Sequence, residues 1–296
     1  MTSHTPRSAA EAALLERISD YWNRRAAGYG LFTRDDINGP EAYRWTCHLT
    51  NTYPLSGRRV LDVGTGGGFL AILAAKAGAD VTAVDISVEM LQAAKVNAQA
   101  SGCEILFTQS AADRLSFPDE SFDVVMCRNV LWNMTDPEAA VAEWVRVLRP
   151  GGALFIADGN HYNHLVDSRF KAVRNALDAA RSHDPKYLGD VDTSVMEQIA
   201  RDLPMTSRNR PDWEIGCLES LGLWGVCCRA AYPAAVRLAD GCEEVVTLDF
   251  IVTAYKPERP CEVPADSAGE VGEQSDGSPD LERVPTDTVT GEKHTA

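Results

Sequence analysis

The stretch VLDVGTGGGFLAILAAKAG, residues 60–78, decides the fold of this chain. It begins with a short apolar run that ends at Asp62, continues through a turn rich in glycine, and closes with a longer apolar segment. This order predicts a buried strand, a tight turn and a helix. Because glycine has no Cβ, such a turn can adopt positive φ and let a ligand approach the backbone beside the N-terminus of the helix.

Outward from this stretch, short apolar runs alternate with amphipathic segments between residues 58 and 158, which is typical of a parallel sheet covered by helices. The predicted strands are residues 59–63, 80–84, 104–108, 122–127, 153–157, 224–231 and 245–256. The last two are expected to pair antiparallel at one edge. The expected fold is therefore α/β: a Rossmann-like sheet of seven mostly parallel strands, with helices on both faces and an antiparallel edge strand.

Helices are predicted where apolar residues recur at helical spacing between the strands. The predicted helices are residues 9–27, 88–100, 137–148 and 213–221. Ser87 and Asp136 stand directly before two of these segments, where their side-chain oxygens can cap the first turn. These caps fix where the two helices begin.

Composition and charge limit the class of protein. The chain has 296 residues, 45% of them hydrophobic and 24% charged, which suits one large domain with additions. No run of about 18 apolar residues is present, and the N-terminus lacks the basic start and apolar core of a secretory signal. These features predict a cytoplasmic protein without a membrane span.

The net charge of −15 is shared between the body and an acidic C-terminal segment. Residues 257–296 hold ten acidic and three basic side chains and no aromatic residue, so we expect a disordered acidic tail. The remaining body is also acidic, which disfavours a nucleic-acid partner because phosphate backbones are repelled. The eight cysteines show no CxxC pair, so reduced, packed thiols are expected and no metal site is predicted.

The second predicted strand carries a candidate ligand-binding carboxylate. It runs into AVDIS and ends at Asp85, twenty-one residues after Gly64, so the carboxylate emerges beside the glycine turn. There it can accept hydrogen bonds from both hydroxyls of a ribose. The GxGxxG pattern of dinucleotide-binding proteins requires a small residue where this chain has Phe69, three positions after Gly66, and this weakens the case for a nicotinamide cofactor.

The glycine turn instead matches DxGxGxG through Asp62, Gly64, Gly66 and Gly68. Further landmarks follow in order: Ala112-Asp113, FPDESFDVVMCRNVLW at residues 117–132 and RVLRPGGALFIADG at residues 146–159. Together with YWNRRAAGY (21–29) and DISVEML (85–91), residues 21–158 resemble the class I S-adenosylmethionine-dependent methyltransferases. The resemblance is closest to the small-molecule group that includes the ubiquinone and menaquinone C-methyltransferases.

The resemblance implies S-adenosylmethionine as cofactor. The residues it assigns to the cofactor are Tyr21, Tyr29, Asp62, Gly64, Thr65, Gly66, Gly68, Asp85, Ile86, Met90, Ala112, Asp113, Arg128, Asn129 and Trp132. Among these, Asp85 holds the ribose and Asp113 accepts from the adenine amino group. Tyr21 and Tyr29, together with Trp22, belong to a lid over the cofactor or to plain helix packing. Trp132 either attracts the sulfonium by a cation–π interaction or packs in the core.

The resemblance divides the chain into an N-terminal helical lid (1–52), a methyltransferase domain (53–256) with a substrate-cover insertion at 160–213, and the tail (257–296). In the cover, His161 is the candidate catalytic base, with a structural histidine as the alternative. The candidate substrate residues are Tyr162, Arg208, Arg210 and Trp213, where the arginines could bind an anionic group or belong to ordinary surface. The quinone enzymes' C-terminal signature is not recognisable after Asp158, so the resemblance does not carry a quinone substrate.

The expected function is transfer of a methyl group from S-adenosylmethionine to the O, N, S or C atom of a small-molecule acceptor. Positioning provides most of the catalysis in such a displacement, so the absence of an obvious catalytic residue does not argue against it. Two alternatives remain: a non-catalytic regulator that binds the same cofactor, and a nicotinamide-dependent oxidoreductase. The sequence gives no prediction of oligomeric state.

Overall fold

The apolar runs of the sequence form the strands of one central sheet. The computed structural model describes residues 6–180, 185–188, 191–237 and 241–259, and residues 1–259 make up one compact unit. The strands are β1 (Arg59–Val63), β2 (Asp80–Asp85), β3 (Leu106–Gln109), β4 (Phe122–Arg128), β5 (Leu148–Gly159), β6 (Trp224–Arg237) and β7 (Glu243–Tyr255). They are ordered β3-β2-β1-β4-β5-β7-β6.

The direction of the strands confirms the predicted fold class. Strands β1 to β5 pair parallel, β7 pairs antiparallel with β5, and β6 pairs antiparallel with β7. The antiparallel strand is thus inserted next to the edge, and β6 at the edge runs in the same direction as β5. Because the five parallel strands share one orientation, their carboxyl ends meet along one edge of the sheet.

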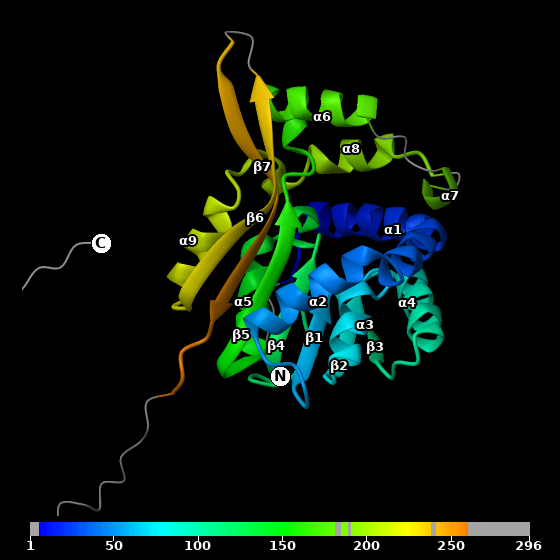
Figure 1. Cartoon of the computed structure of the whole chain (residues 1–296), viewed down its shortest axis with the longest axis vertical. Coiled ribbons are helices and arrows are strands. Elements are labelled where there is room, and N and C mark those ends of the chain that lie inside the picture. The colour runs from blue at the N-terminus through cyan, green and yellow to red at the C-terminus, as the bar shows by residue number, and fades with distance from the viewer. Residues whose placement is uncertain (1–5, 181–184, 189–190, 238–240, 260–296) are drawn as a thin grey trace, which may run out of the picture. The chain divides into compact units, whose positions relative to one another are not determined.

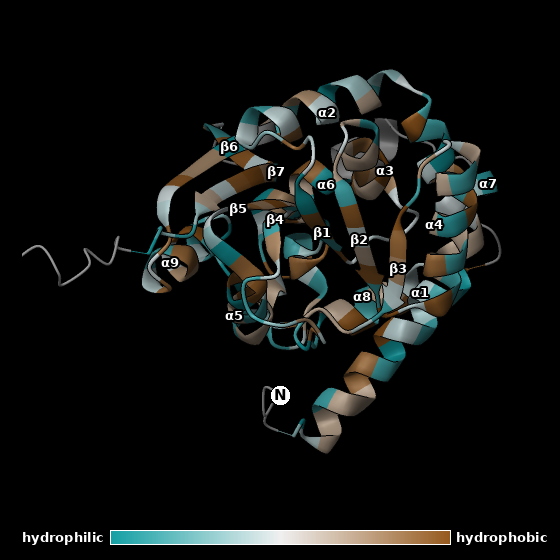
Figure 2. Cartoon of the chain, turned by 90° about the horizontal axis from the view of Figure 1, so that it is seen from below, coloured by the Kyte–Doolittle hydropathy of each residue, from teal (hydrophilic) through white to brown (hydrophobic). Residues whose placement is uncertain are grey.

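Helices cover both faces of the sheet, as predicted. The helices are α1 (Ala9–Ile37), α2 (Pro40–Thr52), α3 (Phe69–Lys76), α4 (Val88–Ala100), α5 (Pro137–Val147), α6 (Ser168–Ala180), α7 (Pro185–Leu188), α8 (Ser194–Ala200) and α9 (Asp212–Ser220). Short 3-10 turns are η1 (Leu131–Asn133), η2 (Asn163–Leu165) and η3 (Pro204–Ser207). Helices α2 and α3 lie on one side of the strands, and α5 and α9 lie on the other (Figure 2).

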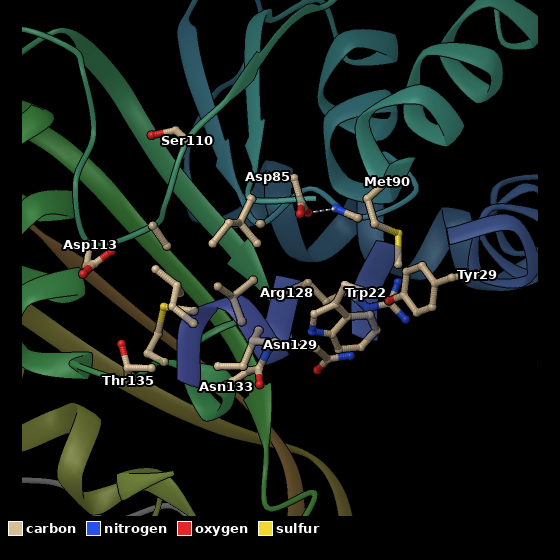
Figure 3. A pocket seen from close by; sticks show the side chains of 18 residues that line it. Trp22, Tyr29, Asp85, Met90, Ser110, Asp113, Arg128, Asn129, Asn133 and Thr135 are labelled. Carbon is tan, nitrogen blue, oxygen red and sulfur yellow. Dashed lines mark hydrogen bonds between the residues drawn. The ribbon is translucent and has the colours of Figure 1, made fainter. Parts of the chain in front are cut away.

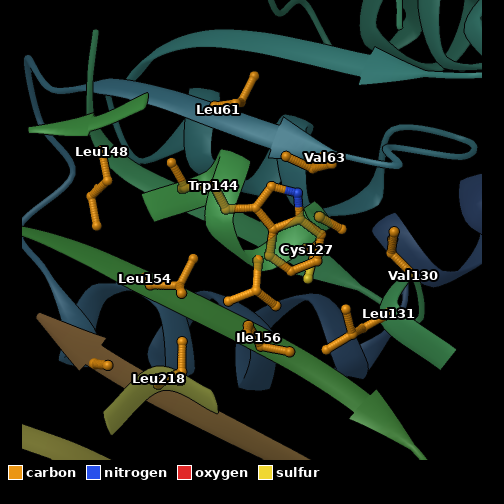
Figure 4. Packing of buried hydrophobic residues seen from close by; sticks show 14 of the residues in the cluster. Leu61, Val63, Cys127, Val130, Leu131, Trp144, Leu148, Leu154, Ile156 and Leu218 are labelled. Atoms are coloured by element: carbon orange, nitrogen blue, oxygen red, sulfur yellow. The ribbon is translucent and has the colours of Figure 1, made fainter. Parts of the chain in front are cut away.

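Trp144 of α5 is the centre of the core on the α5 side of the sheet. Its side chain is fully buried and packs among branched side chains of β1, β4 and β5 such as Leu61, Val125 and Ile156 (Figure 4). The indole Nε1 donates a hydrogen bond to the backbone oxygen of Ala112 at 3.0 Å. This bond gives the buried N–H a partner and anchors the loop that follows β3.

Local capping chemistry sets the beginnings of three helices. Ser87 Oγ accepts from Met90 N at 3.0 Å, and Asp136 Oδ1 accepts from Ala139 N at 2.9 Å, as predicted. Helix α1 begins with a capping box in which Ser8 and Glu11 each accept from the other's backbone N–H. The side chain–backbone bonds replace the partners that the first helical N–H groups lack.

Helix α1 is longer than predicted, because it continues from residue 27 to Ile37. The prediction ended the helix before Gly28 and Gly30, which are poor helix formers. Both glycines allow close packing: a Cβ on Gly30 would lie 2.8 Å from Cβ of Ala93 in α4, and a Cβ on Gly28 would overlap the backbone of Tyr187 in α7. Tertiary packing therefore outweighs the local cost of glycine.

Strand β6 is also longer than predicted and reaches Arg237 through Pro233. The prediction stopped at residue 231, before the proline. Proline lacks the N–H of a central strand but is tolerated at an edge, and β6 is the edge strand. The outer part of the β6–β7 hairpin covers α6 through a small apolar cluster that includes Val173 and Val246 (Figure 1).

Three further findings concern the described residues alone. None of their helices is long and apolar enough to cross a bilayer. In the same ranges, no group of three or more His, Cys, Asp or Glu side chains could hold a metal ion. Of the cysteines that fall within these ranges, Cys47, Cys103, Cys127, Cys217, Cys227 and Cys228 are free thiols. Of the acidic tail predicted at residues 257–296, residues 260–296 lie outside the described residues.

Candidate functional site

A cavity of about 740 Å³ lies at the carboxyl edge of the parallel strands, under helix α1. Its lining residues come from α1 and from the loops after β1, β2, β3 and β4: Leu15, Ile18, Trp22, Tyr29, Gly64, Gly66, Asp85, Ile86, Met90, Ser110, Ala112, Asp113, Arg128, Asn129, Val130, Asn133, Met134 and Thr135. Asp113 and Ser110 mark one end of the cavity and Tyr29 the other (Figure 3).

The glycine loop after β1 forms one wall of the cavity. Gly64 and Gly66 have φ values of 63° and 52°, in the left-handed region that favours glycine. A Cβ on Gly64 would lie 2.5 Å from a methyl carbon of Val130, and one on Gly66 would lie 3.0 Å from the ring of Tyr29. The loop therefore needs glycine both for its backbone and for the space in front of it.

Asp62 holds the glycine loop from behind. Its Oδ2 accepts two hydrogen bonds, from Thr65 Oγ1 at 2.7 Å and from Ala71 N at 3.1 Å. Burial raises the pKa of this carboxyl to about 7, against the lowering effect of the two hydrogen bonds. Asp62 and Thr65 do not line the large cavity, but they line an adjoining hollow of about 360 Å³ that Gly64, Tyr29 and Arg128 share with it.

Asp85 lines the cavity where β2 ends, as predicted. Its Oδ2 accepts from Gly66 N at 2.8 Å (Figure 3), and its Oδ1 accepts from Ser87 N at 2.9 Å. Burial raises the pKa of Asp85, and the backbone hydrogen bonds oppose this rise. The carboxylate thus ties the glycine loop to the start of α4 while facing the space where a ligand would lie.

One face of α1 forms the roof of the cavity. Ile18, Trp22 and Tyr29 lie on that face because residues three, four and seven positions apart are neighbours on a helix. Tyr21 turns away and is buried against the cover segment in a cluster with Met196 of α8. Of the three lid residues named from the sequence, Trp22 and Tyr29 line the cavity and Tyr21 does not.

Asp113 lines the far end of the cavity and already has a partner. Arg7 NH2 lies 2.5 and 2.7 Å from its two carboxylate oxygens, although the two residues are 106 positions apart. The segment before α1 is thereby fixed across this end of the cavity. No pattern in the sequence indicates Arg7, since a single arginine ahead of a helix is not distinctive.

Arg128 ends β4 with its guanidinium in contact with two aromatic rings. Its Cζ lies 4.7 Å from the ring centroid of Trp45 and 4.4 Å from that of Phe69, and NH2 lies 3.7 Å from Asp36 Oδ2. Stacking of this kind fixes the plane of the guanidinium. Arg128 therefore presents a preorganised positive charge to both the large cavity and the adjoining hollow.

Trp132 does not line the cavity, although the sequence nominated it to face the sulfonium. Its Nε1 donates to the backbone oxygen of Asn129 at 2.9 Å, and its ring packs against Trp22, Tyr162 and His161. Trp22 covers it on the cavity side, with ring centroids 6.4 Å apart. Trp132 is therefore packed among other side chains, which is the alternative given above to a contact with the sulfonium.

Asn129 follows β4 in an unusual conformation and connects the cavity to His161. Its φ of 57° places a non-glycine residue in the left-handed region, as is frequent at functional sites. Its Oδ1 lies 3.2 Å from His161 Nε2. Asn129 also lines a separate hollow of about 390 Å³, together with Asp158, Asp249 and others on the α2 side. His161 stands behind this wall and is 29% exposed.

The four candidate substrate residues do not line the cavity, and Arg210 differs most from the prediction. Arg210 is buried and paired with Asp158 and Glu214, so it cannot meet an anionic ligand in this arrangement. Arg208 lies over the ring of Trp213 at 4.7 Å and pairs with Glu138 of α5. Tyr162 stacks on Trp132, and burial raises its pKa.

Several cavity residues were absent from the predicted site. They are Leu15, Ile18, Ser110, Val130, Asn133, Met134 and Thr135. The last four belong to the loop between β4 and the cap of α5, and the rule that ligands bind at the carboxyl ends of parallel strands would have indicated them. The two α1 residues could be found only by knowing which face of the helix lies over the sheet.

The chain matches a known family over its central part. Residues 61–156 match the family described as "Methyltransferase domain". This range runs from β1 to β5 and includes the glycine loop, Asp85, Asp113 and Asn129.

Named relatives agree with this match. The chain is 38% identical over 114 residues to "Ubiquinone biosynthesis O-methyltransferase" of Xylella fastidiosa, covering 38% of this chain and 46% of that protein. It is 36% identical over 141 residues to the protein of the same name in Methylococcus capsulatus, covering 41% and 59%. The chain thus spans about half the length of the curated relatives it matches. A solved structure of an S-adenosylmethionine-dependent methyltransferase from Methanosarcina mazei has a TM-score of 0.47 and 20% identity, covering 72% of this chain and 98% of that one.

Proposed function

We propose that this chain, whose residues 61–156 form a methyltransferase domain, transfers a methyl group from S-adenosylmethionine to a small-molecule acceptor. The observation that carries the proposal is the position of Asp85. Its carboxylate lines the cavity at the end of β2, directly beside the glycine loop and bonded to it. A ribose placed against the loop would present its two hydroxyls to this carboxylate.

The residues present fit this cofactor along its length. Arg128, held against two aromatic rings, offers a cation for the carboxylate of the methionine portion, next to the hollow behind the glycine loop. Asp113 offers an acceptor for the adenine amino group at the other end of the cavity. Ile86 and Met90 supply apolar surface between these two ends. Asp62, Thr65 and Gly68 do not line the cavity, so we propose that they act by shaping the glycine loop.

When bound, S-adenosylmethionine supplies an activated methyl group with a built-in leaving group, so the protein's task is alignment. Trp22 and Tyr29 present aromatic faces to the cavity, and Trp22 is placed to attract a positive charge by a cation–π interaction. This role, which the sequence suggested for Trp132, passes in the proposal to the indole that lines the cavity.

The acceptor is proposed to enter beneath the cover segment, residues 160–213, and the N-terminal helices. This placement of the acceptor is supported by the apolar cluster that joins Ile18 and Tyr21 of α1 to Met196 and Ile199 of α8. Helices α6 and α8 lie beyond α1 at the end of the sheet toward which β5 points (Figure 1). The acidic body favours a small acceptor over a nucleic acid.

A hydroxyl acceptor is the first to test, because both named relatives are O-methyltransferases. An acceptor of this kind must lose a proton, and His161 is the base that the structure offers beside Asn129. Buried or partly buried free thiols such as Cys127, Cys217 and Cys228 fit a reducing compartment, so a cytoplasmic location remains part of the proposal.

Calorimetry with S-adenosylmethionine, S-adenosylhomocysteine and NAD tests the cofactor. We expect saturable micromolar binding of the first two and none of NAD, since the third glycine of the dinucleotide pattern is replaced by Phe69. Saturable binding of NAD alone would overturn the proposal. A screen of phenols, amines and thiols scored by S-adenosylhomocysteine release then separates an enzyme from a cofactor-binding regulator, which would release none.

A further inference from the structure

Three charged side chains are buried together behind the cofactor cavity. The side chains of Asp158, Arg210 and Glu214 are 0%, 1% and 0% exposed. Arg210 NH2 lies 3.1 Å from Asp158 Oδ2, Nε donates to Glu214 Oε1 at 2.5 Å, and NH1 donates to the backbone oxygen of Gly159 at 2.8 Å. Burying charges this deeply gives little net stability, so the cluster calls for another explanation.

Asp158 connects this cluster to the wall of the site. Its Oδ2 accepts from Trp132 N at 3.0 Å, its Oδ1 accepts from Gly159 N at 2.7 Å, and Oδ1 lies 3.6 Å from His161 Nε2. The same carboxylate therefore fixes the start of η1 and faces the imidazole. Arg210, which belongs to the cover segment, holds this carboxylate from the opposite side.

The contacts of His161 favour one tautomer of the neutral ring. Nε2 faces two oxygen atoms, Asn129 Oδ1 at 3.2 Å and Asp158 Oδ1 at 3.6 Å. A carboxylate oxygen can only accept, so the hydrogen of the neutral ring belongs on Nε2. Nδ1 then carries the lone pair, which is the arrangement that a proton acceptor needs.

The charges around His161 come from four elements. Asp158 of β5 and Asp249 of β7 favour the protonated ring, whereas Arg210, ahead of α9, and Arg174 of α6 oppose it. Burial is the largest effect and lowers the pKa of His161. Without Arg210, two carboxylates would face the ring with Arg174 as their main counter-charge, and protonation would become easier.

We propose that Arg210 is a positioning residue, which, through Asp158, keeps His161 neutral with its hydrogen on Nε2 and Nδ1 open to accept a proton. The use of that lone pair on an acceptor rests on the proposed function. The charge and tautomer of His161 do not depend on the proposed function, so the role of Arg210 and the methyltransferase activity can be refuted separately.

NMR titration of His161 in the full chain tests the proposal without any turnover. The resonance is assigned by its loss in His161→Gln. We expect the wild-type ring to titrate below its ordinary value of about 6.5 and to carry the Nε2–H tautomer when neutral. Arg210→Gln should raise the titration midpoint by about one pH unit, and Arg210→Lys should keep it near the wild-type value.

Arg149→Gln is the matched control. Arg149 Nε pairs with the largely buried Asp123 at 2.6 Å, near the starts of β5 and β4 and thus at the end of the sheet opposite to His161. Its loss breaks a comparable ion pair and should leave the His161 titration unchanged. A midpoint that moves equally in both variants would reveal a general loosening of the fold and overturn the proposal.

The wild-type measurement decides the matter even where Arg210→Gln does not fold. An imidazole that titrates at or above its ordinary value, or that carries its hydrogen on Nδ1, overturns the proposal. An unchanged midpoint in folded Arg210→Gln does the same. Once an acceptor is known, the acidic limb of kcat/KM should follow the NMR midpoint in each variant. If the midpoint moves and the limb does not, Arg210 keeps its positioning role and the base role of His161 fails.

Discussion

The carboxyl group of Asp62 should make the protein less stable as the pH rises, and Asp62→Asn should remove this dependence. Both hydrogen bonds to the side chain end on one oxygen, Oδ2, at 2.7 Å from Thr65 Oγ1 and 3.1 Å from Ala71 N. The amide oxygen of asparagine can accept both in the same place. The substitution therefore removes the titrating group and keeps the contacts that shape the glycine loop.

The sign and size of the effect follow from the pKa of Asp62. Burial raises it from 3.8 to about 7, so the folded protein binds this proton more tightly than the unfolded chain does. The destabilisation is absent at a pH below the pKa of Asp62 in the unfolded chain, grows as the pH rises from that pKa to the pKa in the folded protein, and is complete above the latter. At about 1.4 kcal/mol per pH unit it reaches roughly 4 kcal/mol, of which about 3 kcal/mol develops between pH 5 and pH 8.

Thermal denaturation without cofactor measures the effect. Relative to wild type, Asp62→Asn should gain about 3 kcal/mol between pH 5 and pH 8, or about 5 °C or more in Tm for a chain of this size. Comparing the two proteins at each pH cancels the other titrating groups. Asp136→Asn, at the exposed N-cap of α5, controls for the exchange of a capping carboxylate. A stability difference that is the same at both pH values would refute the reasoning.

Three further expectations concern the cavity and the tail. Asp85→Ala should weaken cofactor binding by about 2 kcal/mol or more, because the ribose hydroxyls lose their acceptor, and it should also lower Tm, because Gly66 N loses its acceptor too. Calorimetry that shows an affinity within twofold of wild type would contradict this. Arg7→Ala should raise cofactor affinity by two- to fivefold in the same assay, since it frees Asp113 from a partly exposed ion pair, and an unchanged affinity would show that the pair does not compete. Truncation after Arg259 should leave cofactor binding and Tm unchanged, because residues 260–296 have no apolar pattern with which to join the core, and a loss of either would mean that the tail docks.

The sequence was sufficient for the fold because the deciding signals are local. The glycine turn, the caps at Ser87 and Asp136, and the alternation of apolar runs each act within a few residues, and all three agree with one another. The order of the strands, β3-β2-β1-β4-β5-β7-β6, was not predicted, because the rules for parallel sheets limit the possible orders without selecting one. The same locality explains Asp85: a residue that ends a parallel strand beside a glycine loop is placed at the carboxyl edge by the backbone alone.

Only the tertiary structure decided which side chains of the helices and the cover meet the site. Arg210 appeared in the sequence as one arginine in a polar loop, yet it is buried against Asp158, fifty-two positions earlier in the chain. Trp22, Tyr21 and Trp132 are all large aromatic residues, so residue type does not show which of them lines the cavity. The way α1 lies over the sheet brings only Trp22 of the three to the cavity. Such contacts depend on packing between residues far apart in the sequence, and a local sequence pattern does not identify those partners. The edge of the sheet at which the strands end, in contrast, is set by backbone hydrogen bonds.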